Sequence, residues 1–230
     1  MKIGVFGATG VIGARVVTEA QRRDHEVTAF ARDSSRFPAA QDGASWRVAN
    51  WLDADSIADA ITGLDVVISA VNAGHGIPDT IANAGNFVTG ARAMLTALQR
   101  HPDIRVITVG GAGSLEIAPG LQLVDSPDFT RGLTEDLGVP AEYRDVVLAL
   151  REALNLYRLS NRDWTYLSPS SGRINPGERT GRYRTGSDQL LLGSDDISAE
   201  DLAVALLDEA DNPRFRQRRF TVGAETSDAA

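Results

Sequence analysis

Three glycines near the start of the chain have a spacing that suggests chemistry. Gly7, Gly10 and Gly13 form the pattern G-x-x-G-x-x-G, between a strand-like run at 2–6 and an amphipathic segment at 11–23. In that context Gly7 permits a sharp turn, Gly10 lets backbone approach a ligand, and Gly13 lets the helix lie close to its strand. Because of this position between a strand and a helix, the otherwise common glycine pattern indicates a ligand-binding turn.

The start of the helix after these glycines is suited to binding an anion. Its first N–H groups have no partner within the helix, and the positive end of its dipole lies there. We therefore predict that the turn binds the pyrophosphate of a dinucleotide, with Thr9 adding a hydroxyl donor. The alternative is a glycine-rich turn that only connects a strand to a helix. The predicted cofactor contacts of this turn are Gly7, Thr9, Gly10, Val11 and Ile12.

The end of the second strand-like run bears on which dinucleotide is bound. An enzyme that uses NAD usually places Asp or Glu there to hold the ribose 2′-hydroxyl. Here the chain has Arg32 followed by Asp33. A guanidinium at position 32 would pair with the 2′-phosphate of NADP, so we favour NADP, or NADPH when reduced. NAD stays possible, with Asp33 in the acidic role or Arg32 as a solvated surface charge.

Strand-length apolar runs alternate with segments of helical periodicity, which predicts repeated β-α units. The predicted strands are 2–6, 26–31, 45–49, 65–71, 104–109, 164–168 and 219–223. The predicted helices are 11–23, 55–62, 86–100, 143–159 and a last one that begins after Ser198 and ends near Asp211. We predict an α/β fold of the Rossmann type, with a doubly wound, mostly parallel sheet of about seven strands and helices on both faces.

Length and the loosening of this pattern after residue 168 predict the domain organisation. We expect a single domain at 1–223, a substrate-side insertion at 171–195 that forms a small C-terminal substrate region, and a frayed tail at 224–230. Loop sequences of this kind follow no rule that would identify the substrate that binds there. The oligomeric state, monomer or homodimer, stays open.

Composition excludes several classes of function. The net charge of −8 argues against a protein that grips nucleic acid, because that affinity comes from clustered Lys and Arg. The chain has no cysteine, which excludes disulfides and thiolate sites, and its three histidines have no metal-ligand spacing. No apolar run is long enough to span a membrane. We expect a cytoplasmic protein with a small-molecule ligand, no metal and no membrane partner.

Several motifs together resemble one known family. They are Gly-Ala-Thr-Gly-Val-Ile-Gly at 7–13, Arg32, Leu-Asp-Ala-Asp-Ser-Ile at 52–57, Asp-Val-Val-Ile-Ser-Ala at 65–70, Val-Gly-Gly-Ala-Gly-Ser at 109–114, Asp-Trp-Thr-Tyr-Leu-Ser-Pro-Ser at 163–170 and Pro-Gly-Glu-Arg-Thr-Gly at 176–181. Over nearly its whole length the chain resembles atypical and extended short-chain dehydrogenases/reductases. Within them it resembles the NAD(P)H-binding branch that contains NADH-flavin reductases, and it looks similar to flavin reductase, also called biliverdin reductase B.

The resemblance implies further cofactor contacts at the ends of the strands. The position of Asn50 is usually Asp in the family. The implied contacts are Asn50 and Trp51 near adenine, Ala70, Val71 and Asn72 near the inner ribose, and Gly110, Gly111, Pro169 and Ser170 toward the nicotinamide. All follow strands, where open α/β sheets bind their ligands.

The proton-transfer pair of most short-chain dehydrogenases is incomplete here. These enzymes use Tyr-x-x-x-Lys, in which the lysine lowers the tyrosine pKa. Tyr143 begins a predicted helix, but Val147 stands four residues later, and Lys2 is the only lysine of the chain. We expect Tyr143 to pack or to contact substrate more than to act as a tuned acid. Ser114 has two readings of equal weight, a hydrogen bond to the nicotinamide amide or acceptor and a local loop cap.

Hydride transfer to a conjugated acceptor needs no such pair, because the cofactor carries the chemistry and the protein positions the rings. We therefore predict an NAD(P)H-dependent reductase whose substrate is FMN, another free flavin or a similar acceptor. Alternatives are a non-catalytic redox sensor of the NmrA-like kind and an enzyme similar to sugar-nucleotide epimerases or dehydratases. His75 lies in a glycine-rich loop, where we expect it to be solvated; the alternative is that it borders the substrate.

Overall fold

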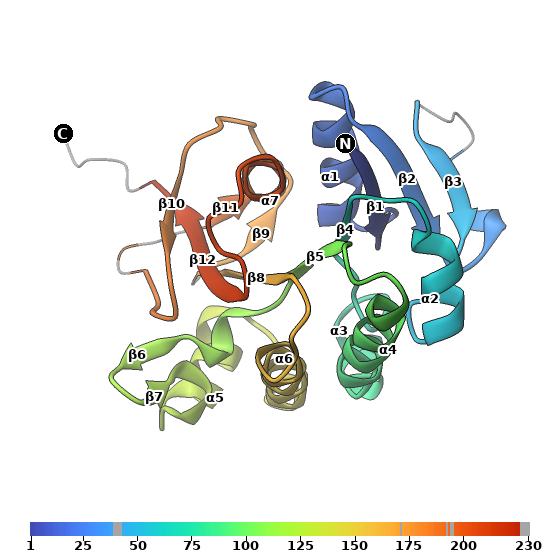
Figure 1. The fold of residues 1–230 in the computed structure, drawn as a ribbon. Helices are drawn as coiled ribbons and strands as arrows, with labels where there is room; N and C mark the ends of the chain where they lie inside the picture. Colours follow the sequence, from blue (N-terminus) through green and yellow to red (C-terminus); the bar gives the residue numbers. More distant parts are fainter. Residues whose placement is uncertain (39–42, 171, 192, 194–195, 226–230) are drawn as a thin grey trace.

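The apolar runs form one large sheet in the computed structural model, which describes residues 1–38, 43–170, 172–191, 193 and 196–225 (Figure 1). The strands of this sheet are β1 (Lys2–Phe6), β2 (Glu26–Ala31), β3 (Ser45–Val48), β4 (Val66–Ser69), β5 (Arg105–Val109), β8 (Trp164–Pro169), β10 (Tyr183–Gly186) and β12 (Arg218–Ala224). Their order is β10-β12-β8-β5-β4-β1-β2-β3. Within the described residues every neighbouring pair of this sheet is parallel except β10 with β12.

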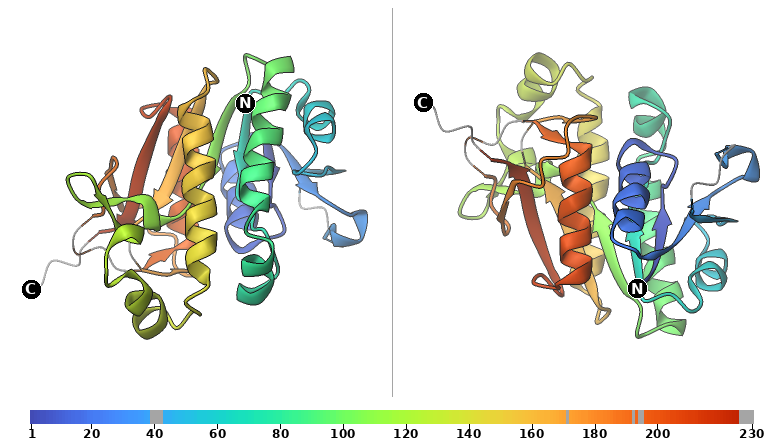
Figure 2. Two further views of the ribbon diagram at one scale, coloured as in Figure 1. Left: turned by 90° about the horizontal axis from the view of Figure 1, so that it is seen from below. Right: turned by 90° about the horizontal axis from the view of Figure 1, so that it is seen from above.

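Helices cover both faces of the sheet. The longer helices are α1 (Val11–Arg22), α2 (Ala54–Ile61), α4 (Asn86–Arg100), α6 (Tyr143–Arg158) and α7 (Ala199–Asp211), and the shorter ones are α3 (Ile77–Ala82) and α5 (Phe129–Arg131). Figure 2 shows α4 and α6 side by side on one face and α1 and α7 side by side on the other. Single turns and short irregular helices are η1 (Ser34–Arg36), η2 (Ala112–Ser114), η3 (Leu123–Asp125) and the π-helical η4 (Gly132–Asp136).

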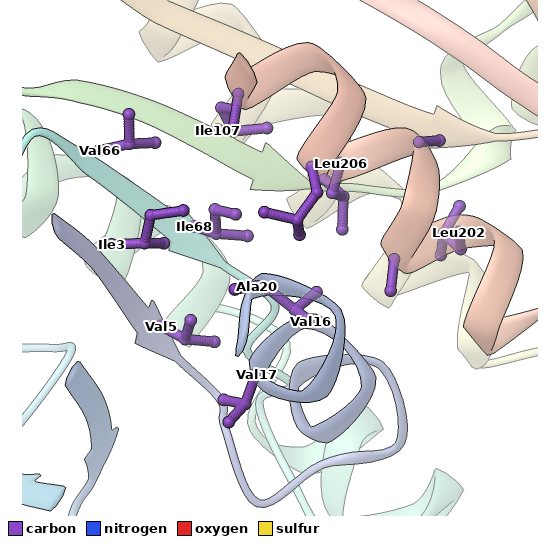
Figure 3. Packing of buried hydrophobic residues seen from close by; sticks show 14 of the residues in the cluster. Ile3, Val5, Val16, Val17, Ala20, Val66, Ile68, Ile107, Leu202 and Leu206 are labelled. Carbon is purple, nitrogen blue, oxygen red and sulfur yellow. The ribbon is translucent and has the colours of Figure 1, made fainter. Parts of the chain in front are cut away.

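The alternation of side chains along β1 explains how the two layers form. Ile3 and Val5 are fully buried on the α1/α7 face, while Phe6 joins the cluster under α2, α4 and α6. Figure 3 shows Ile3 and Val5 on the side of the strand that faces α1, where Val16, Val17 and Ala20 lie. Burial of each such side chain contributes about 1.5–3 kcal/mol, which fixes the first helix to the strands beneath it.

The strand order indicates where this sheet can bind a ligand. After β3 at one edge, the chain crosses over β1 and β2 and enters β4 on the far side of β1. The carboxyl ends of β1 and β4 therefore lie at the point where the strand order reverses, which is where open α/β sheets bind ligands.

The predicted Rossmann-type α/β fold is confirmed, with one difference in the sheet. The main sheet has eight strands within the described residues, because β10 adds an antiparallel edge strand to the predicted set. This strand falls within the segment predicted as an insertion. It was missed because it is short, contains Arg and Gly, and needs only one neighbour to pair with.

Other boundaries also differ from the predictions. The predicted strand 65–71 ends at Ser69, so residues 70–72 leave the sheet. Four short strands and α3 were not predicted; these strands are β6 (Glu116–Ala118), β7 (Leu121–Gln122), β9 (Ile174–Asn175) and β11 (Ile197–Ser198). Ser198 caps α7 as predicted, accepting a hydrogen bond from the Asp201 N–H.

Of the predicted tail, Ala224 belongs to β12, and 226–230 lie outside the described residues, as do 171, 192 and 194–195 of the predicted insertion. No helix among the described residues is long and apolar enough to cross a membrane.

Candidate functional site

A cavity of about 840 Å³ lies at the carboxyl ends of the central strands. Its walls come from the turn after β1, the ends of β2, β4 and β5, and the first two turns of α6. This volume falls within the roughly 300–1,000 Å³ of small-molecule sites. The predicted site residues that line it are Gly7, Thr9, Gly10, Val11, Ile12, Arg32, Trp51, Ala70, Val71, Asn72, Gly110 and Tyr143.

The glycine turn has the shape that a pyrophosphate requires. Gly7 has φ +78°, a conformation that strains other residues, and a Cβ at Gly13 would overlap the Gly7 carbonyl. Gly10 is the N-cap of α1, and the first turn of this helix contains no acidic residue. The N–H groups at the start of α1 are thus open to an anion without competition from a side-chain cap. The turn therefore fits the phosphates of a dinucleotide.

A basic group borders the cavity beside this turn. Arg32 follows β2, Ser35 and Arg36 belong to η1, and His75 comes from the loop after β4. The Arg36 guanidinium donates to Nε2 of His75 at 2.9 Å, which joins the two loops across the cavity edge. Asp33 is exposed and caps η1: its carboxylate accepts the Ser35 N–H at 2.8 Å, and this bond lowers the pKa of Asp33. Arg32, and not Asp33, is among the lining residues.

The residues after β3 divide between the cavity and its surroundings. Trp51 lines the cavity, and its ring lies against Gly90 of α4, where an added Cβ would overlap it. The ring centroid of Phe87 is 6.4 Å from that of Trp51. Asn50, predicted as a contact, is exposed and outside the described lining, because its side-chain oxygen accepts the Leu52 N–H at 3.1 Å and so turns the local loop.

The end of β4 builds the loop that carries His75. Asn72 donates from its amide to the Thr80 hydroxyl at 3.0 Å, and its oxygen accepts the Ala73 N–H at 3.0 Å. The His75 N–H donates to the carboxylate of Asp79 at 2.7 Å. These bonds fold the loop over the end of the sheet and place the imidazole at the cavity.

The opposite end of the cavity is bordered mainly by apolar groups. Gly110 follows β5, Tyr143 and Leu150 lie on α6, and Ile174 comes from β9. The Tyr166 ring packs beneath Gly110, so closely that an added Cβ would overlap it. This end can hold a flat apolar ring, with the phenol of Tyr143 as a hydrogen-bond donor.

Tyr143 is not tuned as an acid. It is half-buried, burial raises the pKa of its phenol, and its hydroxyl has no hydrogen-bond partner among the described residues. Val147, one turn later, packs against Gly113 in η2. The position of the missing lysine is therefore filled by an apolar contact, and no cation there lowers the tyrosine pKa.

Several predicted contacts lie outside the described cavity lining. Ser114 is buried, and its hydroxyl accepts a hydrogen bond at 2.8 Å from Arg219, because the chain turns toward β12 after β5. Arg219 is distant in the sequence, so this bond is not the predicted local loop cap, and a contact of Ser114 with the nicotinamide or the acceptor stays a prediction. The Ser170 hydroxyl accepts the Leu191 N–H at 3.1 Å, so the segment before β11 covers it. Pro169 pairs with β12, and Gly111 lies just beyond the lining, beside Leu150.

Sequence reasoning missed several residues that line the cavity. They are Phe6, Phe30, Ala31, Ser35, Arg36, Ala49, Gly74, His75, Gly76, Phe87, Val109, Val146, Leu150 and Ile174. Arg36 had a usable signal, a second arginine four residues after Arg32, whereas Ile174 had none. His75 is exposed, as expected of a solvated loop histidine, and it also borders the cavity, which is the alternative that the sequence left open. Among the described residues, no group of three or more His, Asp or Glu side chains could hold a metal ion.

Comparison with known proteins relates this geometry to one family. A family model described as NAD(P)H-binding matches residues 7–213. An uncharacterized protein of Bacillus subtilis (strain 168), YwnB, is 35% identical over 236 residues, covering 98% of this chain and 99% of the relative.

Solved structures of similar proteins cover almost the whole chain. A "putative exported protein" of Burkholderia pseudomallei is 40% identical with a TM-score of 0.79, over 97% of this chain and 99% of that one. A "putative NADH-flavin reductase" of Streptococcus pneumoniae TIGR4 is 30% identical with a TM-score of 0.78, over 98% and 100%. A "putative epimerase" of Bacteroides thetaiotaomicron is 33% identical with a TM-score of 0.77, over 97% and 96%.

Proposed function

The chain belongs to the NAD(P)H-binding family, and on this basis we propose that it is an NADPH-dependent reductase whose acceptor is a free flavin or a similar conjugated molecule. One observation carries the proposal. A single cavity joins a glycine turn that fits a pyrophosphate, a basic group beside it, and a largely apolar end where no lysine stands beside the tyrosine. The "putative NADH-flavin reductase" name of the Streptococcus pneumoniae protein is consistent with the flavin acceptor, although it names NADH and not NADPH.

The preference for NADPH over NADH rests on the charges at the cavity edge. Arg32 and Arg36 supply two guanidinium groups, and His75 lies within hydrogen-bond distance of Arg36. These groups suit a ribose 2′-phosphate, because a guanidinium offers a charged fork to phosphate oxygens. Asp33, which would favour NADH, is occupied with capping η1.

The residues at the apolar end position the acceptor. A bound reduced nicotinamide supplies the hydride, which carries two electrons to the acceptor. Val146 and Leu150 of α6 provide flat apolar walls, and the Tyr143 phenol can donate a hydrogen bond to a carbonyl or ring nitrogen of the acceptor. Since Tyr143 is not tuned as an acid, the proton that completes reduction comes from water. The contribution of the chain is thus placement more than proton transfer.

Steady-state kinetics test the proposal. Purified protein is mixed with NADPH or NADH and with FMN, riboflavin or a quinone, and nicotinamide oxidation is followed by absorbance. We expect turnover with at least one of these acceptors and a higher kcat/KM for NADPH than for NADH. Tight NADPH binding without turnover would favour a redox sensor, and absence of binding by fluorescence titration would end the proposal.

An epimerase or dehydratase activity has less support. The similar structure from Bacteroides thetaiotaomicron bears the name "putative epimerase". However, Val147 packs against Gly113 where a short-chain dehydrogenase places the lysine that assists proton transfer. Incubation with nucleotide sugars followed by chromatography should therefore show no conversion.

A further inference from the structure

The segment Pro176-Gly-Glu-Arg-Thr-Gly181 stands out in the sequence, and none of its residues lines the described cavity. It begins two residues after Ile174, which does line the cavity. Ile174 lies on β9, which pairs with β11 just before α7, in register with Ile197 (Figure 1). The segment therefore continues directly from Ile174, which forms one wall of the apolar end of the cavity, where the proposed acceptor would bind. We call this end the acceptor end.

Arg179 ties this segment to the helix that carries the phosphate turn. Its Nε donates to Oε2 of Glu19 at 2.7 Å and its Nη2 donates to Oε1 at 2.8 Å, a bidentate pair. Glu19 lies on α1 and its side chain is only 5% exposed. Arg23 donates to the same carboxylate at 2.9 Å. The hydrogen bond from Arg179 and the burial of Glu19 act in opposite directions on the pKa of Glu19, and the net result is a lowered pKa.

The flanks of the segment are fixed to α7. The buried Asp201 carboxylate accepts hydrogen bonds from the Thr180 hydroxyl at 2.6 Å and from the Gly181 N–H at 2.7 Å. Glu200 accepts the Gly177 N–H at 2.8 Å and, with its other oxygen, Nε of Arg15 on α1 at 2.9 Å. Hydrogen bonds to two packed helices, α1 and α7, thus hold the segment along its length. Among the described contacts, only the Arg179–Glu19 pair joins the centre of the segment to α1.

We propose that Arg179 is a positioning residue for the acceptor, since its bidentate pair with Glu19 fixes the segment behind Ile174 to the same helix that holds the cofactor phosphates. One rigid helix then sets the distance between the phosphate turn and the acceptor wall. The inference rests on the proposed function, because it assigns the wall at Ile174 to the acceptor. A small displacement of this wall lowers the affinity for the acceptor more than the affinity for the cofactor. Cofactor binding depends on the other end of α1, where the phosphate turn lies.

Paired substitutions test this role on the full chain. Arg179→Met removes the fork at similar length, and Arg179→Lys keeps the charge without it. Arg182→Met is the matched control, because Arg182 directly follows the segment, is 73% exposed and faces Glu225 at 3.9 Å. The readouts are the NADPH Kd, the FMN Kd in the presence of NADP⁺ by flavin fluorescence, kcat and KM for FMN, and amide exchange at Gly177 and Gly181 by NMR.

We expect Arg179→Met to raise the FMN Kd and KM about tenfold while kcat and the NADPH Kd change less than twofold, with faster exchange at both glycines. Arg179→Lys should recover part of the FMN affinity, and Arg182→Met should match the wild type. Unchanged FMN affinity, or an equal loss of NADPH and FMN affinity, would overturn the proposal. If the wild type binds both ligands but reduces no acceptor, the proposed function fails while the affinity and exchange data still decide the role of Arg179.

Discussion

The end of the cavity proposed to bind the cofactor phosphates (the phosphate end) and the end proposed to bind the acceptor (the acceptor end) are built in different ways. The phosphate end comes from two short contiguous stretches, the turn at 7–13 and the basic residues at 32–36, with His75 added from one loop. The acceptor end combines Gly110 after β5, one face of α6 and Ile174 of β9, which are far apart in the sequence. A site made from one local motif can be identified from its spacing, whereas a site assembled from distant segments depends on how those segments pack.

The largest expected effect tests whether the glycine turn alone determines cofactor binding. In Gly13→Ala the new Cβ overlaps the Gly7 carbonyl, so the turn or α1 must shift away from the phosphates. We expect the NADPH Kd to rise about 100-fold or more, measured by fluorescence titration. Gly85→Ala is the control, because a Cβ there meets no atom within 4 Å. Binding within threefold of the wild type in Gly13→Ala would contradict the assignment of the phosphate end.

A second prediction concerns the charges beside that turn. Arg32→Ala should weaken NADPH binding about 30-fold and NADH binding less than threefold, since only NADPH carries the 2′-phosphate. Titration of both cofactors measures the ratio. Arg47→Ala, an exposed arginine of β3 outside the described lining, is the control and should leave both affinities unchanged. Equal losses for the two cofactors would show that Arg32 does not select NADPH.

At the acceptor end the expected effect is smaller. Tyr143→Phe removes one hydrogen-bond donor and keeps the apolar ring, so the acceptor KM should rise about fivefold or less with kcat nearly unchanged. Steady-state kinetics with FMN at saturating NADPH measure both constants. A drop in turnover by about 100-fold or more would instead show that Tyr143 transfers a proton, despite its raised pKa.

The smallest effect concerns the pair that joins the two ends. The hydrogen bond from Arg179 leads the causes that hold the folded-state pKa of Glu19 below its ordinary 4.5. Its carboxylate therefore stabilises the fold at pH values above the unfolded pKa, and this contribution is lost as pH falls through the lowered folded pKa. The difference in unfolding free energy between the wild type and Glu19→Gln, from urea titrations, should be constant near neutral pH and shrink below about pH 4.5. A difference that grows on acidification would refute this account.

The sequence by itself determined the features that depend on local patterns. The glycine spacing, the apolar runs and Ser198 as a helix cap are properties of a few neighbouring residues, so the Rossmann-type fold followed from them, as did the places of the glycine turn and Arg32 at the cavity. The single lysine, Lys2 at the start of β1, likewise limited the chemistry, because the chain has no other ammonium side chain that could lower the pKa of a tyrosine.

Only the tertiary structure decided which residues face the cavity away from the phosphate turn. Ser114 and Ser170 follow strands as site residues do, yet Arg219 and the Leu191 N–H occupy their hydroxyls, and both partners come from distant segments. His75 reaches the cavity because its loop folds over the sheet, and Ile174 reaches it because β9 pairs with β11. Such contacts depend on long-range packing that no local spacing encodes, which is why the proposed acceptor end could be outlined only from the three-dimensional structure.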